Sequence, residues 1–251
     1  MVEKFKPIDL EQPFRLRKKP EITSEIRERG RIEYTKRLNE LVLKAILKHI
    51  EGVSYRGMRV GSSVIAANAD ANGEFQVESA HNFKPRRLRQ YGWDKLCAEN
   101  NACTAAILDG GEYISGLVVV SNHQNLGTDP EDATHSEKAL HSCQNCRNLY
   151  RELIGQGIMS EETMIRFVND ESLVYEDAGD PETIIAGSDT DPRTMGISKL
   201  KLKKEITESD IDALPYEEMT IGEFLHLPDY KNDKPAKTGK IQPPYTLQWP
   251  G

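Results

Sequence analysis

The chain has 251 residues, of which 37% are hydrophobic and 29% are charged, so it can form a core with a well-solvated surface. The formal net charge is -7, and this acidic balance argues against a general nucleic-acid binder because phosphate backbones would be repelled. No apolar run approaches the roughly 18 residues of a membrane-spanning helix, and the N-terminus lacks the apolar stretch of a secretory signal, so we expect a cytoplasmic protein.

The N-terminal part of the chain predicts an arm followed by one helix. Residues 1–24 contain three prolines and mixed charges, which is typical of an extended arm. Thr23 or Ser24 could cap a helix over residues 25–49, in which apolar residues recur at helical spacing.

Strands and helices alternate through the next part of the chain. The β-like residues 58–66, the turn-forming residues 68–73 and the alternating residues 74–77 predict a hairpin. Further predicted elements are a helix from about 97 to 108, stopped by Asp109-Gly110-Gly111, a buried strand at 114–121, a helix from 143 to about 154, and a strand at 164–168. This order predicts helices packed on both faces of one mixed sheet.

The C-terminal part is punctuated by proline, glycine and acidic residues. Residues 170–214 have few clear periods and predict a surface insertion. Thr220-Ile221-Gly222-Glu223 is a capping-box pattern. Residues 231–251 contain four prolines and predict either a disordered tail or an arm laid on a partner subunit. We therefore expect one main domain over residues 25–230, flanked by the arm and the tail.

The spacing of the four cysteines predicts a metal site. In a reducing compartment, closely spaced cysteines more often hold a metal than form disulfides. Cys97, Cys143 and Cys146 would give three thiolates, which suit zinc and leave its fourth position open for water, as in catalytic sites. Both cysteine groups are predicted to open helices, where unpaired N–H groups stabilise thiolates. The spacing of Cys143 and Cys146 places both sulfurs on one helical face.

Glu99 follows the first of these cysteines by two residues. Its carboxylate could reach the open position and take up and redeliver a proton from water that zinc activates to a pKa of about 7. This chemistry suits attack on an amidine carbon with release of ammonia. One alternative is a structural site with Cys103 as fourth ligand, although six residues of helix place it about 9 Å along from Cys97. The other is that all four cysteines are buried core residues without metal.

Four segments, in order, resemble the cytidine deaminase family, particularly its three-cysteine branch, which includes blasticidin-S-deaminase-like members. They are residues 58–63 (MRVGSS), Cys97-Ala98-Glu99, residues 142–147 (SCQNCR) and residues 218–225 (EMTIGEFL). The resemblance implies a three-layer α/β/α sandwich around a five-stranded mixed sheet, with Zn2+ on the three cysteines and Glu99 as proton shuttle. It also implies that the Ala98 backbone helps to hold the base, and that the chain forms a dimer or tetramer.

The chain departs from the family pattern at three places. Ser142 stands where a proline usually precedes the second ligand. Asn100 replaces an arginine that compensates the thiolate charge, so Arg147 would take part of that role. Gln76 and Glu78 stand for the Asn-x-Glu that binds the ribose, so Glu78 could still accept a sugar hydroxyl. The alternative for Gln76 and Glu78 is an ordinary strand end that faces solvent.

The segment before the first cysteine suggests further substrate contacts. A basic loop would favour an anionic substrate if it lines the pocket mouth, but it is equally consistent with a solvated surface; it contains Lys84, Arg86, Arg87 and Arg89. Tyr91 and Trp93 could stack on a planar ring, and core packing is the alternative for Trp93. His141 precedes Cys143 by two residues, and we expect it on the surface.

The sequence thus predicts a zinc-dependent hydrolytic deaminase of a cytidine-like nucleoside, nucleotide or related small molecule. A polynucleotide-editing deaminase, which acts on a flipped-out base, is supported only by the basic loop. A non-catalytic zinc-stabilised binding protein is the third reading, and there Glu99 would have no use.

Overall fold

The structure is a computed structural model that describes residues 22–54, 59–68, 74–84, 97–121, 141–177 and 199–227. The predicted N-terminal arm except for its last residues, the C-terminal tail, and most of the basic loop with Tyr91 and Trp93 lie outside these ranges. Across the ranges that are described, no helix combines the length and the apolarity needed to cross a bilayer.

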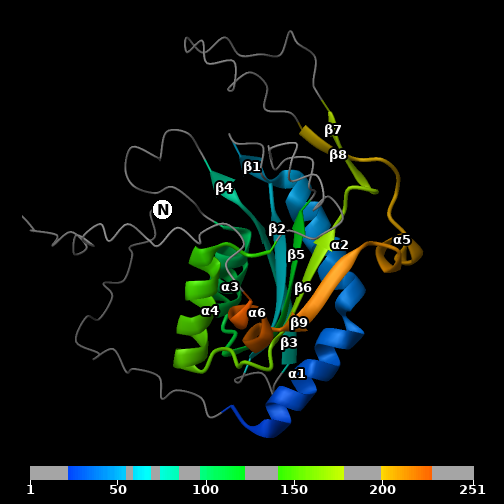
Figure 1. Ribbon diagram of the computed structural model, residues 1–251. Helices are drawn as coiled ribbons and strands as arrows, with labels where there is room; N and C mark the ends of the chain where they lie inside the picture. The colour runs from blue at the N-terminus through cyan, green and yellow to red at the C-terminus, as the bar shows by residue number, and fades with distance from the viewer. Residues whose placement is uncertain are drawn as a thin grey trace, which may run out of the picture.

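A mixed five-stranded sheet forms the centre of the molecule, as predicted (Figure 1). Its middle strand β5 (Tyr113–Ser121) pairs antiparallel with β2 (Gly61–Asn68) and parallel with β6 (Met164–Asn169). The outer pairs are antiparallel and join β2 to β3 (Glu74–His81) and β6 to β9 (Tyr216–Thr220). The hairpin predicted from residues 58–77 is the β2–β3 pair. In spatial order the strands are β3, β2, β5, β6 and β9.

Helices cover both faces of this sheet, which confirms the predicted three-layer arrangement (Figure 1). Every residue of β5 is buried, because the strand carries a core on each side. One core includes Leu117 and Val119 and lies under α3 (Ala98–Leu108), α4 (Gln144–Gln156) and α6 (Ile221–His226). The other includes Val118 and Val120 and lies under α1 (Ser24–Lys36) and α2 (Leu38–Glu51). Successive side chains of β5 thus point to opposite layers.

The single helix predicted over residues 25–49 is two helices, which corrects that prediction. Thr23 caps α1, with its hydroxyl accepting a hydrogen bond from the Ile26 N–H at 3.3 Å. The break falls at Arg37, whose backbone leaves the helical region. The Arg37 guanidinium donates to the Phe75 carbonyl of β3 at 2.8 Å and to the Glu40 carboxylate. This contact between α2 and the sheet is tertiary, so helical periodicity could not reveal the break.

Two glycines allow the α1–α2 layer to approach the sheet closely. A Cβ at Gly61 would lie 1.9 Å from the Ala45 carbonyl oxygen of α2. A Cβ at Gly116 would lie 2.1 Å from the ring of Tyr34 in α1. Any side chain at either of these two strand positions would therefore push the facing helix away from the sheet.

The segment 170–214 is not confined to the surface where the structure describes it. It forms β7 (Val174–Asp177) and β8 (Lys199–Leu202), an antiparallel pair, and the short helix α5 (Glu208–Asp212). Leu173, Val174, Leu200, Ile211 and Leu214 are buried in the core beneath α2. The expectation of a purely superficial segment was wrong for these ends, because their apolar residues are buried against α2, in a contact between segments far apart in the sequence.

A two-residue parallel pair joins β1 (Val53–Ser54) to β4 (Phe83–Lys84). The capping box predicted at residues 220–223 is present at the start of α6, where the Thr220 side chain accepts from the Glu223 N–H and the Glu223 carboxylate accepts from the Thr220 N–H.

Candidate metal centre

Two of the predicted ligands occupy equivalent positions at the starts of two helices. Cys97 is the N-cap residue of α3 and Cys143 is the N-cap residue of α4, both with extended backbone. Cys146 follows in the first turn of α4. Helix N-termini present unpaired N–H groups and the positive end of the helix dipole, which stabilise thiolates. The local sequence therefore places all three sulfurs at helix starts, two as N-cap residues and one in the first turn.

The three sulfurs form one cluster, with every pair of Sγ atoms within 4.8 Å. Cys97 Sγ lies 3.5 Å from Cys143 Sγ, and Cys143 Sγ lies 3.9 Å from Cys146 Sγ. Sulfurs bound tetrahedrally to one zinc ion at about 2.3 Å lie about 3.8 Å apart. The donor set and its spacing thus fit zinc. Cys103 is buried in the core and is not part of the cluster, as predicted.

The three thiols shift one another's pKa values through their mutual hydrogen bonds. The hydrogen bonds between Cys143 and its neighbours Cys146 and Cys97 lower the pKa of the Cys143 thiol. The hydrogen bond to Cys143 raises the pKa of Cys97, and hydrogen bonds to Cys143 and Cys97 raise the pKa of Cys146. A cation that binds all three as thiolates must displace the thiol protons, so its affinity increases with pH.

Glu99 is the carboxylate next to this cluster. It lies in the first turn of α3 and is only 4% exposed. Burial raises the pKa of its carboxyl group, and a hydrogen bond from its own backbone N–H opposes that rise. A carboxylate that is buried beside three thiols is suited to proton transfer at the cluster.

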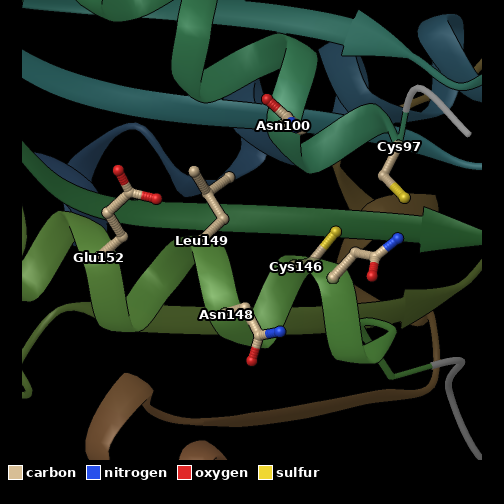
Figure 2. Close-up of a pocket in the computed structure, with 7 residues that line it drawn as sticks. Cys97, Asn100, Cys146, Asn148, Leu149 and Glu152 are labelled. Atoms are coloured by element: carbon tan, nitrogen blue, oxygen red, sulfur yellow. The ribbon is translucent and has the colours of Figure 1, made fainter. Parts of the chain in front are cut away.

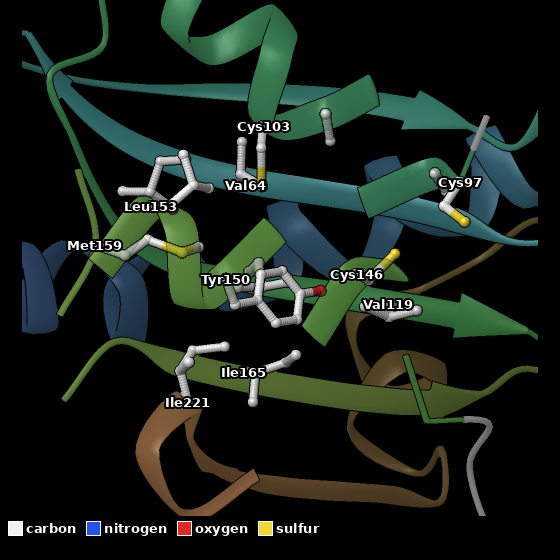
Figure 3. Packing of buried hydrophobic residues seen from close by; sticks show 14 of the residues in the cluster. Val64, Cys97, Cys103, Val119, Cys146, Tyr150, Leu153, Met159, Ile165 and Ile221 are labelled. Atoms are coloured by element: carbon white, nitrogen blue, oxygen red, sulfur yellow. The ribbon is translucent and has the colours of Figure 1, made fainter. Parts of the chain in front are cut away.

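Ser142 and Tyr150 form a buried hydroxyl pair on the inner side of α4. The Ser142 Oγ and Tyr150 Oη atoms lie 3.0 Å apart, and both residues are buried. The Tyr150 ring packs among the core residues, and its hydroxyl points toward the end of the core where Cys146 and Cys97 lie (Figure 3). No sequence pattern singles out Tyr150, because its position opposite Ser142 depends on the turn that precedes α4.

His141 is half-buried and paired, which corrects the expectation of a surface histidine. Its ring packs against Phe167, with centroids 4.7 Å apart, and against Phe224 at 5.7 Å. Its Nε2 atom is hydrogen bonded to the carboxylate of Glu217 on β9. The residues just before Cys143 are therefore anchored to β6, β9 and α6.

Comparisons with known proteins give only distant structural similarity. No protein-family model and no curated protein matches the sequence. Among solved structures, the chain is similar to the cytidine deaminases of Burkholderia pseudomallei, Mycobacterium leprae and Mycobacterium tuberculosis. The first has a TM-score of 0.37 and 19% identity over 53% of this chain and 84% of that one. The second has a TM-score of 0.35 and 20% identity over 51% and 85%. The third has a TM-score of 0.35 and 22% identity over 51% and 82%.

An open depression of about 370 Å³ lies between α3 and α4 and reaches two of the sulfurs. Cys97 and Cys146 stand at one end of it and Glu152 at the other (Figure 2). Its wall is otherwise formed by amides and one leucine, including Asn100, Asn148 and Leu149. No basic side chain lines it within the described part of the chain.

The predicted ribose-binding residues lie on β3, on the face that packs toward α3. Ala80 packs against the core under α3, and strand alternation places Glu78 and Gln76 on the same face. The Gln76 side-chain amide donates to the Asp109 carbonyl at the C-terminal end of α3, 3.3 Å away. Since twelve residues of helix span about 18 Å, Gln76 lies far from Cys97, and Glu78 lies between them. Their substrate roles stay predictions, as does that of Trp93, which lies outside the described residues.

Two other predicted site residues are buried. Ala98 is fully buried at the start of α3, beside the ligand Cys97. Arg147 packs its guanidinium over the Phe224 ring at 4.2 Å and donates to the carbonyl groups of Phe224 and Leu227. These hydrogen bonds tie α4 to the end of α6, and the role of Arg147 in compensating the thiolate charge stays a prediction.

Proposed function

We propose that this protein is a zinc-dependent hydrolytic deaminase of the cytidine deaminase type, in its three-cysteine branch. The observation that carries the proposal is the burial of Glu99 beside the cluster of Cys97, Cys143 and Cys146. A structural zinc site has no use for a buried carboxylate next to its ligands, and burying one without a function costs free energy. The resemblance of residues 97–99 and 142–147 to the family motifs adds independent support.

In this proposal each residue has a defined task. The three cysteines hold the zinc ion, which when bound supplies a Lewis acid that makes water acidic near neutral pH. Glu99 would take a proton from the attacking water and pass it to the leaving amino group, while the water oxygen bonds to the amidine carbon and the C–N bond breaks to release ammonia. The Ala98 backbone helps to hold the base, and Glu78 accepts a hydrogen bond from a sugar hydroxyl.

The substrate in this proposal is a cytidine-like nucleoside, nucleotide or related amidine-bearing ring, and the active assembly is a homodimer or homotetramer. Ammonia release should be measured across cytosine, adenine and guanine bases, nucleosides, nucleotides and antibiotic nucleosides, with the zinc content of the same sample. Light scattering on the eluting protein gives the number of subunits. Turnover of nucleotides in preference to nucleosides would support the anionic substrate that the basic loop suggests.

The mechanism is tested by Glu99→Gln, which keeps the size of the side chain but removes its base. This variant should bind one zinc per chain and lose about 10²–10⁴-fold in kcat. Unreduced turnover would remove Glu99 from the reaction. X-ray absorption provides a test without substrate: three sulfurs and one oxygen fit the proposal, whereas a shell of four sulfurs would indicate a structural site.

A further inference from the structure

The first turn of α3 carries two of the groups on which the candidate metal centre depends. Cys97 is the N-cap residue of the helix, Glu99 lies two positions later, and both are buried. The places of these two groups relative to the sheet depend on what holds this turn. Asn101 bonds the turn to a strand, because its side-chain amide donates to the His81 carbonyl of β3 at 3.0 Å.

A continuous path of hydrogen bonds connects Cys97 to β3. The Asn101 backbone N–H donates to the Cys97 carbonyl at 3.1 Å, which closes the first turn of the helix. The Asn101 side chain then donates to His81, and the direction of this bond is fixed because a carbonyl oxygen only accepts. Asn101 thus fastens the turn that bears a predicted ligand to the sheet.

The acceptor of this bond is itself fixed on its other side. The peptide group between His81 and Asn82 offers its carbonyl to Asn101, and its N–H donates to the Val60 carbonyl at 3.0 Å. The Asn82 side chain accepts from the Val60 N–H at 2.8 Å, and Asn82 and Val60 are both buried. A planar peptide group that is bonded on both sides cannot shift without loss of a bond. Asn101 therefore bonds to a rigid point of the structure.

This rigid point lies at the C-terminal end of the middle strand. Gly61, the first residue of β2, pairs with His81 of β3 on one side and with Val120, the last residue but one of β5, on the other. Because Asn101 belongs to the first turn of α3, its bond to His81 holds that turn at this end of the sheet.

A second amide bond joins the same helix and strand at their opposite ends. There the Gln76 side chain of β3 donates to the Asp109 carbonyl, which follows α3, at 3.3 Å. Both bonds run from a side-chain amide to a backbone carbonyl, but only the bond of Asn101 holds the turn that contains Cys97. The Gln76 bond is therefore a matched control for general loosening of α3.

We propose that Asn101 is a positioning residue of the metal centre, which holds Cys97, and with it Glu99, in place by joining the first turn of α3 to β3. Asn101 is not a ligand and acts through Cys97. This rests on the proposed function, because the placement of these groups matters only if zinc binds there and Glu99 acts beside it.

The test measures the zinc affinity of the full chain by competition with a chromophoric chelator. Asn101→Leu keeps most of the side-chain volume but loses the donor, and it should weaken zinc binding about tenfold, as for other groups that orient a metal ligand. Asn101→Ala tests the same bond with a smaller side chain and should give a similar loss.

Gln76→Leu removes the control bond and should leave the zinc affinity unchanged. Only affinity and stability are compared for this variant, because Gln76 has a predicted substrate role. Both Asn101→Leu and Gln76→Leu should lower the midpoint of thermal unfolding of the zinc-free chain, by about 2–4 °C, since each loses one hydrogen bond.

The action through Cys97 is tested in two backgrounds that each lack one thiol, with Co2+ as a probe whose visible spectrum reports its binding. In Cys143→Ala, which keeps Cys97, adding Asn101→Leu should still weaken cobalt binding about tenfold. In Cys97→Ala the same addition should have no effect, because the ligand that Asn101 positions is absent.

Three outcomes would overturn the proposal: unchanged zinc affinity in Asn101→Leu, an equal loss in Gln76→Leu, or an effect of Asn101→Leu that persists in Cys97→Ala. The second would mean that α3 is loosened as a whole, and the third that Asn101 does not act through Cys97. A chain that binds zinc but releases no ammonia from any compound tested would instead count against the proposed function, and the affinity comparison would still decide the role of Asn101.

Discussion

The Sγ atoms of Cys97 and Cys143 lie 3.5 Å apart although 46 positions separate the two residues in the sequence. The path of the chain explains this contact. Helix α3 runs away from Cys97, and the chain reverses direction at Gly110. Strand β5 then returns along the middle of the sheet, and its C-terminal end lies on the side where α4 begins. The N-termini of α3 and α4 thus meet near the C-terminal end of β5, and each contributes a thiol.

The metal ligands should be separable from the other cysteine by mutation. Cys143→Ala should reduce bound zinc from one per chain to a small fraction, because two thiolates bind far more weakly than three. Cys103→Ala should keep its zinc, since Cys103 lies in the core outside the cluster. Zinc content measured by mass spectrometry after dialysis against a chelator checks both, and loss of metal in both variants would contradict the assignment.

The anchoring of His141 should influence metal affinity. His141→Phe preserves the aromatic packing but loses the hydrogen bond to Glu217, and Glu217→Gln weakens that bond from the other side. Because this contact holds the turn that precedes Cys143, each variant should weaken zinc binding by about tenfold. Competition with a chromophoric chelator measures the change. Glu162→Gln, an exposed carboxylate before β6, is the control and should leave the affinity unchanged.

A buried polar pair on the other face of the sheet should contribute strongly to stability. His49 Nδ1 lies 2.7 Å from Asp170 Oδ2, and both side chains are fully buried. Asp170→Ala leaves the imidazole without this partner and should lower the free energy of unfolding by about 3 kcal/mol. Asp170→Asn keeps a hydrogen-bonding oxygen and should cost less. Urea denaturation at a fixed zinc concentration gives both values, and equal losses would show that the hydrogen bond is not the cause.

The close approach of α2 to β2 should make Gly61 intolerant of any side chain. Gly61→Ala places a methyl group 1.9 Å from the Ala45 carbonyl oxygen and should destabilise the fold by roughly 1–3 kcal/mol through overpacking. Gly155→Ala is the opposite case, since an added Cβ in this turn of α4 meets no atom within 4 Å. It should stabilise the protein by about 0.5–1 kcal/mol through helix propensity. Midpoints of thermal unfolding compare the two directly.

Signals carried within a few residues were sufficient to predict much of the fold. Asp109-Gly110-Gly111 ends α3 because Gly110 adopts a positive φ of 91°. Thr220 and Glu223 cap α6 because their side chains reach each other's backbone N–H groups within one turn. The helix starts at Cys97 and Cys143 were likewise predictable, since an N-cap position and the first turn are local features.

Contacts between distant residues decided the rest. The helix break at Arg37 depends on the Phe75 carbonyl, and the burial of Leu200 and Ile211 depends on the face of α2 that they cover. The pairing of His141 with Glu217 requires β9 to join the sheet beside β6. The amino-acid sequence by itself determined the spacing of the cysteines and the place of Glu99 two residues after Cys97, because spacing is a property of the chain. Only the tertiary structure decided that the three sulfurs lie within 4.8 Å of one another and that Glu99 is buried, because distance and burial exist only once the layers have packed.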